Sequence, residues 1–419
     1  MKKIVFLTAR LPYPASSGRK NVMYNYCKIL HETYGYDITV ISYLEDEDVP
    51  ELKPDFIKNV IVLPHVSAKQ KIKNLLVRTC IQHDWPMQVS LFWSEENEVR
   101  IRKHLEVLKP DVVIADMVRM TEYSKRYTGY KIADLDDMIS VRYERQLQQD
   151  IRSINPYGAY LYSLPLFAQK LLSVKFIKKF VLKNEVQLLK NYERKIAQEH
   201  DKTVFVADRE ARLLNDELGY ECAVGVPLGV DISYYGEYFG KLKKKKNTIV
   251  FLGAMSVAHN EAGAIHFIQD ILPLIKESEP EIQFIVVGGG VTDKLKSFQS
   301  NSVHFTGRVE DVRTVVGTCE VFVCPLTFGS GIKTKSLEAM AMGVPVVTTT
   351  IGAENINAVN GRDWIIADDN KEFANAVVGL IHDRNKRQAM EECAFQFVKK
   401  CFTWKVAEER LKKCLPNGE

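Results

Sequence analysis

The sequence predicts an α/β protein built from two parallel-sheet domains. At 419 residues, the chain is longer than one hydrophobic core usually holds. Short apolar runs alternate with longer helical patterns, which favours parallel strands joined by right-handed crossovers. An apolar heptapeptide also occurs twice, since Lys3–Ala9 and Thr248–Ala254 agree at five of seven positions. Each copy is interpreted as the first strand of a sheet, although buried first strands also converge on such residues by chance.

The expected strands are short apolar runs, several of them uninterrupted, as in strands covered by helices on both faces. They are Ile4–Thr8, Ile38–Ser42, Val60–Leu63, Val112–Ala115, Lys131–Asp134, Thr203–Val206, Ile249–Leu252, Phe284–Val287, Val321–Cys324 and Val344–Thr348.

The domain boundary is expected near residues 235–247, where the lysine run in Gly240–Asn247 suits a linker or a surface turn. We therefore expect a first domain over residues 1–237, a second over 238–395, and a last helix over 396–419 that packs back on the first. Ligands of open parallel sheets bind outside the carboxyl ends of the strands. Two such domains facing each other across a cleft would present these ends to the same space.

Composition excludes several classes of protein. With 46% hydrophobic and 26% charged residues, the chain is neither fibrous nor disordered. A net charge of +4 over this length does not point to nucleic acid. The eight cysteines form no CxxC pair and are expected to be reduced packing residues, not metal ligands. The apolar run after Met1 is too short for a signal peptide and no run is long enough to span a membrane, so we expect a cytoplasmic protein.

The densest motif is Cys324–Pro345, which reads as a strand, a glycine loop at Gly329-Ser330-Gly331 and a helix over Lys335–Met342. Glycines let the backbone approach an anion, and the helix N-terminus adds unpaired N–H groups and a positive dipole end. The alternative is a Gly-Ser-Gly turn before an ordinary surface helix with exposed lysines. The spacing is not that of a Walker A loop, so ATP hydrolysis is not indicated.

Taken in order, the motifs of the second half resemble the GT-B glycosyltransferases of family 4, also called group 1, which transfer sugars with retention of configuration. The segments that carry the resemblance are Gly253–Asn260, Ile271–Ile275, Phe284–Gly288, Phe305–Asp311, Pro325–Gly343 and Val346–Thr350 with Gly352 and Glu354. The resemblance implies a GT-B fold, in which residues 1–237 bind the acceptor and residues 238–395 bind the nucleotide sugar. It covers residues 248–380 well.

The resemblance also implies roles for single residues. Glu338 would hold the ribose hydroxyls, and Arg308 with Val309 would flank the base. The diphosphate would lie on Gly329, Ser330, Gly331, Ile332 and Lys335. Gly18, in the loop after the first strand, would approach the phosphate from the other domain.

Two departures from the family pattern concern the sugar and the phosphates. Many members carry a glutamate eight positions before the one at Glu338, where this chain has Ser330. Many also carry Arg and Lys in the loop after the first donor-domain strand, where this chain has Ala254-Met255 and Asn260. Lys333 and Lys335 are therefore expected to supply more of the phosphate charge.

Catalytic candidates in the first half lie in Lys131–Met138, a strand followed by a loop. Asp136 stands where relatives usually carry a histidine near the reacting carbon, and Asp137 is beside it. One of the two could instead cap the next helix. An Asp-x-Asp pair also holds a metal ion in the other glycosyltransferase architecture. Because a phosphate site is already expected in the second half, we predict no metal and no cofactor, and assign catalysis to Asp136, Asp137 and Lys335.

Residues 157–190 form a candidate membrane face, since residues 170–195 hold eight Lys or Arg against two Glu. On a helical wheel the apolar residues share one arc and the lysines lie away from it: Val174, Ile177, Phe180, Val181 and Leu188 against Lys175, Lys179, Lys183 and Lys190. Such a segment could rest on the inner face of the cell membrane. The alternative is a helix packed on the first domain with a solvated lysine face.

The expected function is a retaining hexosyltransferase that uses a UDP- or GDP-sugar and a glycan or lipid-linked acceptor in surface polysaccharide biosynthesis. The alternatives are a catalytically inert nucleotide-sugar-binding partner of another transferase, and a GT-B nucleotide-sugar epimerase.

Overall fold

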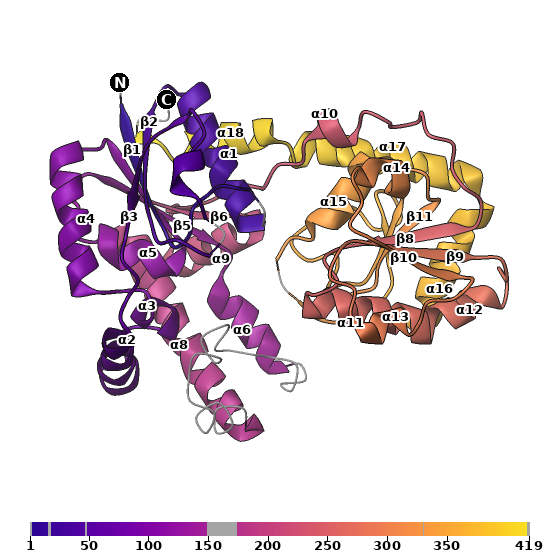
Figure 1. The fold of residues 1–419 in the computed structure, drawn as a ribbon, viewed down its shortest axis with the longest axis horizontal. Helices are drawn as coiled ribbons and strands as arrows, with labels where there is room; N and C mark the ends of the chain where they lie inside the picture. Colours follow the sequence, from indigo (N-terminus) through magenta and orange to yellow (C-terminus); the bar gives the residue numbers. More distant parts are fainter. Residues whose placement is uncertain (1, 16–17, 47, 149–173, 330, 417–419) are drawn as a thin grey trace. The chain divides into compact units, whose positions relative to one another are not determined.

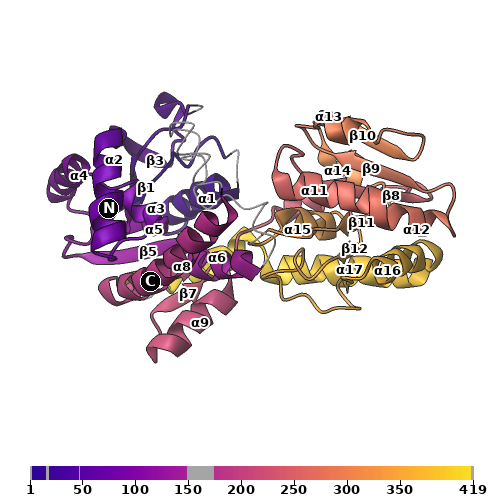
Figure 2. The same ribbon diagram turned by 90° about the horizontal axis from the view of Figure 1, so that it is seen from below.

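The computed structural model describes residues 2–15, 18–46, 48–148, 174–329 and 331–416. The chain forms two compact units, each with its own sheet. Unit 1 comprises Met1–Val226 with Glu408–Glu419, and unit 2 comprises Pro227–Ala407. In both units, helices cover the two faces of the sheet (Figures 1 and 2).

The sheet of unit 1 has seven strands in the order β3-β2-β1-β4-β5-β6-β7, all paired in parallel. Strand β1 lies between β2 and β4, and Ile4 pairs with Ile38 on one side and with Val112 on the other. The strands are β1 (Lys3–Thr8), β2 (Asp37–Ser42), β3 (Ile57–Val62), β4 (Val112–Asp116), β5 (Tyr130–Asp136), β6 (Lys202–Phe205) and β7 (Ala223–Gly225).

The helices of unit 1 follow the strands as crossovers. They are α1 (Gly18–Glu32), α2 (Ala68–Asn74), α3 (Met87–Ser90), α4 (Glu95–Leu108), α5 (Met117–Ser124), α6 (Ile139–Gln148), α8 (Lys175–Glu199) and α9 (Asp208–Leu218), with a 3₁₀ turn at Pro50–Leu52 and a π-helical segment at Leu75–Ile81. Local sequence explains several boundaries. Ser94 caps α4 by accepting from the N–H of Asn97, and Gly219 ends α9 in a left-handed conformation.

The sheet of unit 2 has six strands in the order β10-β9-β8-β11-β12-β13, also paired in parallel. They are β8 (Thr248–Leu252), β9 (Gln283–Val287), β10 (Val303–Gly307), β11 (Val321–Cys324), β12 (Val346–Thr348) and β13 (Ile365–Ile366). The helices are α10 (Ile232–Tyr235), α11 (Ala258–His266), α12 (Leu272–Lys276), α13 (Asp293–Lys296), α14 (Val312–Val316), α15 (Thr334–Ala341), α16 (Asn370–His382) and α17 (Arg384–Cys401), with a π-helical segment at Phe267–Ile271. Helix α18 (Trp404–Lys412) begins in unit 2 and ends in unit 1.

The repeated heptapeptide occupies the same place in both sheets. Strand β1 lies between β2 and β4, and β8 lies between β9 and β11. In each sheet the strand order reverses beside this strand, as in Rossmann folds. The prediction of two Rossmann-like α/β domains is therefore confirmed, and each expected strand has a counterpart in the structure.

The boundaries differ from those expected. The chain passes from unit 1 to unit 2 at Val226–Pro227, so the expected boundary at 237/238 lies inside unit 2. The lysine run is a surface turn of that unit, because Lys244 donates to the Gly343 carbonyl at 2.8 Å and the N–H of Lys245 bonds Thr318. Of the expected last segment, 396–419, only the part from Glu408 onward belongs to unit 1.

Helix α8 is only partly the amphipathic helix that the sequence predicts. Residues 157–173 lie outside the described residues. In the later turns, Leu182, Val186 and Leu189 join the core of unit 1, and Leu188 is buried as well. The first two turns are different, since Phe176 and Phe180 are 78% and 60% exposed. No helix within the described residues is both long and apolar enough to cross a membrane.

Candidate active site

In unit 2, two strand-end loops meet where the strand order reverses, between β8 and β11. The loop after β8 leads into α11, and the loop after β11 carries the glycines and leads into α15. The two loops touch, since a Cβ placed on Gly329 would lie 3.6 Å from the Cβ of His259 in the first turn of α11. This edge is where doubly wound sheets bind nucleotides.

The glycine loop adopts a backbone that other residues rarely adopt. Gly329 has φ +123° and Gly331 has φ +76°. Lys333, at the N-cap of α15, is buried and donates from Nζ to the Gly331 carbonyl at 2.7 Å. The structure therefore places the Lys333 ammonium against the loop backbone, and Ile332 packs partly on the core. Ser330 lies outside the described residues.

Lys335 lies in the first turn of α15 and reaches the loop after β8. Its ammonium donates to the Asn260 side-chain carbonyl and lies 4.8 Å from the centre of the Phe251 ring. Asn260 in turn donates to the Ala254 carbonyl at 2.9 Å. Burial lowers the pKa of Lys335, because the charged form loses water. An anion bound at this helix N-terminus would interact favourably with the Lys335 ammonium and stabilise its charged form.

His259 adds no positive charge to this site at neutral pH. Burial, Lys335 and Lys333 together lower its pKa to about 4, so the imidazole is neutral at pH 7. The cationic character of the site therefore comes from the two lysines and from the N-terminus of α15.

Glu338 follows Lys335 by one turn on α15. Burial raises the pKa of its carboxyl, while a hydrogen bond from Tyr235 and the charge of Lys335 oppose the rise. Burial and the same contact raise the pKa of Tyr235, which lies on α10. A carboxylate at this depth can accept hydrogen bonds from a diol, as a ribose would require.

The loop after β10 holds the two residues that are expected to flank a base. Arg308 is exposed, and Val309 packs partly against the core of unit 2. Asp311, at the end of the same loop, caps α14 by accepting from the N–H of Arg313 at 2.9 Å. Of the predicted nucleotide residues that the structure describes, all except Gly18 belong to unit 2.

In unit 1, the ends of β4 and β5 meet a buried arginine from α1. Arg19 contacts Asp116 at 2.6 Å, Asp134 at 3.0 Å and Asp136 at 3.2 Å. Asp116 stands at the N-cap of α5, yet its side chain makes no capping bond and accepts from Arg19 instead. Three carboxyl groups therefore share one guanidinium at this sheet edge.

Asp136 and Asp137 have different surroundings. Asp136 ends β5 in a left-handed conformation, φ +67°, which is strained for a residue with a side chain. Burial raises its pKa to about 6, with Arg19 opposing and Asp137 adding to the rise. Asp137 is paired with Arg142 at 3.1 Å. Asp136 is therefore the better candidate for contact with a substrate.

Gly18 is the first residue of α1 and has open space beside it. Apart from its neighbours in the chain, no atom lies within 4 Å of the position that a Cβ would occupy. It belongs to unit 1 with Asp136 and Asp137, whereas the glycine loop, the lysines and Glu338 belong to unit 2. Its role toward a phosphate stays a prediction.

Sequence reasoning missed Arg19 and Tyr235. The signal for Arg19 was its place directly after Gly18, which was already expected near the phosphate. Tyr235 gave no signal, because it precedes the lysine run in the segment that was expected to link the domains.

Comparison with known proteins identifies the second unit. Residues 246–383 match the model of the family described as "Glycosyl transferases group 1". The chain carries a group 1 glycosyltransferase domain. This domain includes the glycine loop, both lysines and Glu338, and it confirms the expectation of a glycosyltransferase.

Relatives extend the likeness beyond the group 1 domain. An uncharacterized 44.6 kDa protein in the cps region of Klebsiella pneumoniae is 21% identical over 95% of this chain and 96% of its own. The phosphatidyl-myo-inositol mannosyltransferase of Mycobacterium leprae is 24% identical over 50% of this chain. That match spans little more than half of the mannosyltransferase, 57% of its length.

Among solved structures, Anabaena HepE in complex with UDP superposes with a TM-score of 0.64. The comparison covers 99% of each chain at 13% identity. At this identity the likeness concerns the fold alone, and both units of the chain share that fold.

Proposed function

We propose that this protein is a retaining glycosyltransferase that moves a sugar from a UDP- or GDP-sugar to a glycan or lipid-linked acceptor. The observation that carries the proposal is the position of Lys335 at the N-terminus of α15, beside the glycine loop and one turn before Glu338. This arrangement suits a diphosphate with a ribose on one side. The Klebsiella relative in a cps region supports a role in surface polysaccharide biosynthesis.

In the proposed reaction, the bond between the sugar C1 and the β-phosphate oxygen breaks as a bond to the acceptor oxygen forms on the same face. The acceptor proton passes to the departing diphosphate. Lys335 and the N–H groups of α15 stabilise the negative charge that develops on that diphosphate, which is where electrostatic catalysis is most effective. The reaction as proposed requires no metal ion or other cofactor.

The test is to incubate the protein with a panel of UDP- and GDP-sugars, with and without EDTA, and to measure free nucleoside diphosphate. A transferase slowly hydrolyses its donor without an acceptor, and EDTA should leave this rate unchanged. Binding without turnover would instead identify an inert partner of another transferase, and an isomerised sugar nucleotide would identify an epimerase.

Asp136 is expected to determine the acidic limb of the pH–rate profile, where activity falls as the pH drops. If its carboxylate contacts the donor sugar or the acceptor in ionised form, the rate should fall as the pH drops below about 6. In Asp136→Asn this limb should disappear and the rate should fall about 100-fold or more, the usual cost of removing one group that stabilises charge in the transition state. A pH–rate profile checks both. Asp137→Asn breaks the pair with Arg142 and removes a charge that raises the pKa of Asp136, so it should keep the limb but shift it to lower pH. An unchanged Asp136→Asn profile would contradict the role.

The membrane contact is proposed for the first turns of α8. Val174, Phe176 and Phe180 are exposed there, close in sequence to Lys179 and Lys183. Replacing Lys179 and Lys183 together by Gln should weaken co-sedimentation with anionic liposomes, because each lysine near such a surface contributes about 1 kcal/mol. The pair Lys190→Gln and Lys195→Gln, in the part of the helix that packs on unit 1, serves as the control. Equal binding of all three proteins would refute the contact.

A further inference from the structure

Tyr235 and Glu338 come from helices that are far apart in sequence and packed together in unit 2. Helix α10 contacts α15, and the Tyr235 hydroxyl interacts with the Glu338 carboxylate, to which it can donate a hydrogen bond. A carboxylate that binds a ribose diol has to present its oxygens in a fixed direction. A donor on one side leaves the remaining lone pairs for the ligand.

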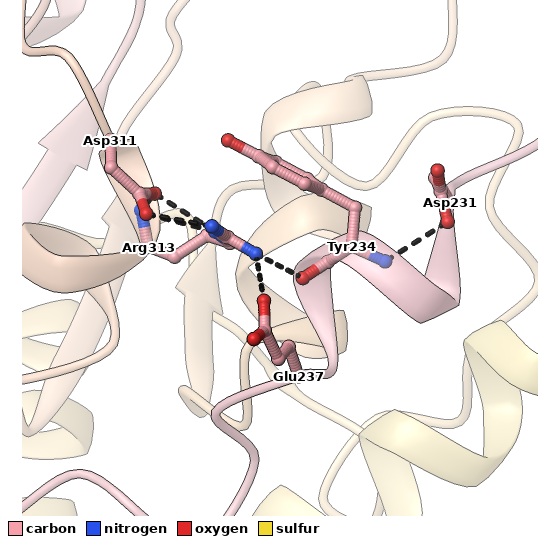
Figure 3. Close-up of polar contacts among 5 residues, drawn as sticks. All are labelled: Asp231, Tyr234, Glu237, Asp311 and Arg313. Atoms are coloured by element: carbon pink, nitrogen blue, oxygen red, sulfur yellow. Dashed lines mark hydrogen bonds and ion pairs between the residues drawn. The ribbon is translucent and has the colours of Figure 1, made fainter.

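Helix α10 has only four residues, so its own hydrogen bonds cannot hold it in place. Asp231 caps it by accepting from the N–H of Tyr234 at 3.0 Å. Arg313 then fixes its exposed side, since its guanidinium lies 3.8 Å from the centre of the Tyr234 ring. The polar contacts around this helix are drawn in Figure 3.

Arg313 also joins α10 to the loop after β10. Its guanidinium donates to the Asp311 carboxylate at 2.8 Å, to the Tyr234 carbonyl at 3.0 Å and to the Glu237 carboxylate at 2.5 Å (Figure 3). Asp311 belongs to the loop that carries Arg308 and Val309. One arginine therefore fixes both the loop expected beside the base and the helix that carries Tyr235 toward the carboxylate of Glu338.

We propose that Tyr235 is a positioning residue of the nucleotide site, which orients Glu338 toward the ribose and is itself held by the Arg313 contacts. The inference rests on the proposed function, because it takes the ligand of Glu338 to be the ribose of a UDP- or GDP-sugar. It adds to the nucleotide site a residue from the segment between the two sheets.

The hydroxyl also acts on the protonation of Glu338. The charged or titratable groups that face this carboxyl are Tyr235 on α10 and Lys335 on α15, and both lower its pKa against the effect of burial. Removing the hydroxyl raises the pKa further, so Glu338 becomes protonated at a higher pH. Because a protonated carboxyl accepts the diol poorly, nucleotide binding by a Tyr235→Phe protein should decline at a higher pH than in the wild type.

The experiment measures the dissociation constants of UDP and GDP by calorimetry from pH 5.5 to 8 for four proteins. Tyr235→Phe should bind about tenfold more weakly at pH 5.5 and show a smaller deficit at pH 8. Tyr234→Phe, which removes a hydroxyl from the same helix and keeps the ring and carbonyl that contact Arg313, should match the wild type. Glu338→Gln should bind weakly at every pH, without the acidic decline.

The outcomes separate the two proposals. If Glu338→Gln loses binding while Tyr235→Phe matches the wild type in affinity and pH profile, the inference is overturned and the nucleotide site stands. An equal loss in Tyr234→Phe and Tyr235→Phe would also overturn it, because the effect would then not pass through Glu338. If Glu338→Gln binds as the wild type does, the ribose assignment in the proposed function fails.

Discussion

Lys335→Ala should lower the turnover of a nucleotide sugar about 100- to 1,000-fold, the usual cost of removing one group that stabilises transition-state charge. The loss is expected to be large because the neighbouring charges cannot replace it. The Lys333 ammonium bonds the Gly331 carbonyl, and His259 is neutral at pH 7 with a pKa of about 4. Steady-state kinetics with the donor identified by the panel measure the effect.

The matched control is Lys276→Ala, which removes an exposed lysine of α12 in the same unit and should keep full activity. A circular dichroism spectrum and a melting curve like those of the wild type would show that Lys335→Ala is folded. A folded Lys335→Ala protein with wild-type turnover would remove this lysine from the mechanism.

Arg19→Met should destabilise unit 1 by about 3–5 kcal/mol, the cost of leaving buried charges without their partner. Its guanidinium is the cation in contact with Asp116, Asp134 and Asp136 at the ends of β4 and β5. For a unit of this size, the transition in a calorimetric scan should move down by roughly 6–20 °C. Arg102 lies at an exposed position of α4, where its Nε is 3.9 Å from a carboxylate oxygen of Glu106. Arg102→Met should therefore change the transition temperature little.

The pH dependence of this loss distinguishes charge from packing. Burial raises the pKa of Asp134 and, to about 6, that of Asp136, while Arg19 opposes both. Without the arginine, the pKa values of Asp134 and Asp136 in the folded state should rise further above their values in the unfolded chain. The folded variant then binds more protons than the unfolded one, so its stability increases as the pH falls. The deficit of Arg19→Met should therefore be smaller at pH 5 than at pH 7.5, and a constant deficit would indicate lost packing alone.

The parallel sheets could be predicted from the sequence because their central strands are almost entirely buried. Strands such as β1, β4 and β11 are short runs of Val, Ile, Phe and Leu covered by helices on both faces, and few other structures produce that pattern. The strands that were not expected are edge or short ones. Strand β10 includes His304 and Thr306 and lies at the edge of its sheet, and β13 has two residues.

The residues proposed for the nucleotide in unit 2 could be grouped from the sequence, because the glycine loop, both lysines and Glu338 are contiguous. Side chains brought together from distant segments were not. Arg19 and Asp136 are 117 positions apart, and Lys335 and Asn260 are 75 apart. The position of Tyr235 depends on where unit 2 begins, and the expected boundary placed that residue outside it.

The central claim is that unit 2 binds a nucleoside diphosphate between the glycine loop and Lys335. Thermal-shift measurements with UDP, GDP and the corresponding nucleosides test it directly. The account predicts that UDP or GDP raises the melting temperature, that the nucleosides without phosphate do so far less, and that Lys335→Ala abolishes the shift. No shift with either diphosphate, or an unchanged shift in Lys335→Ala, would contradict it.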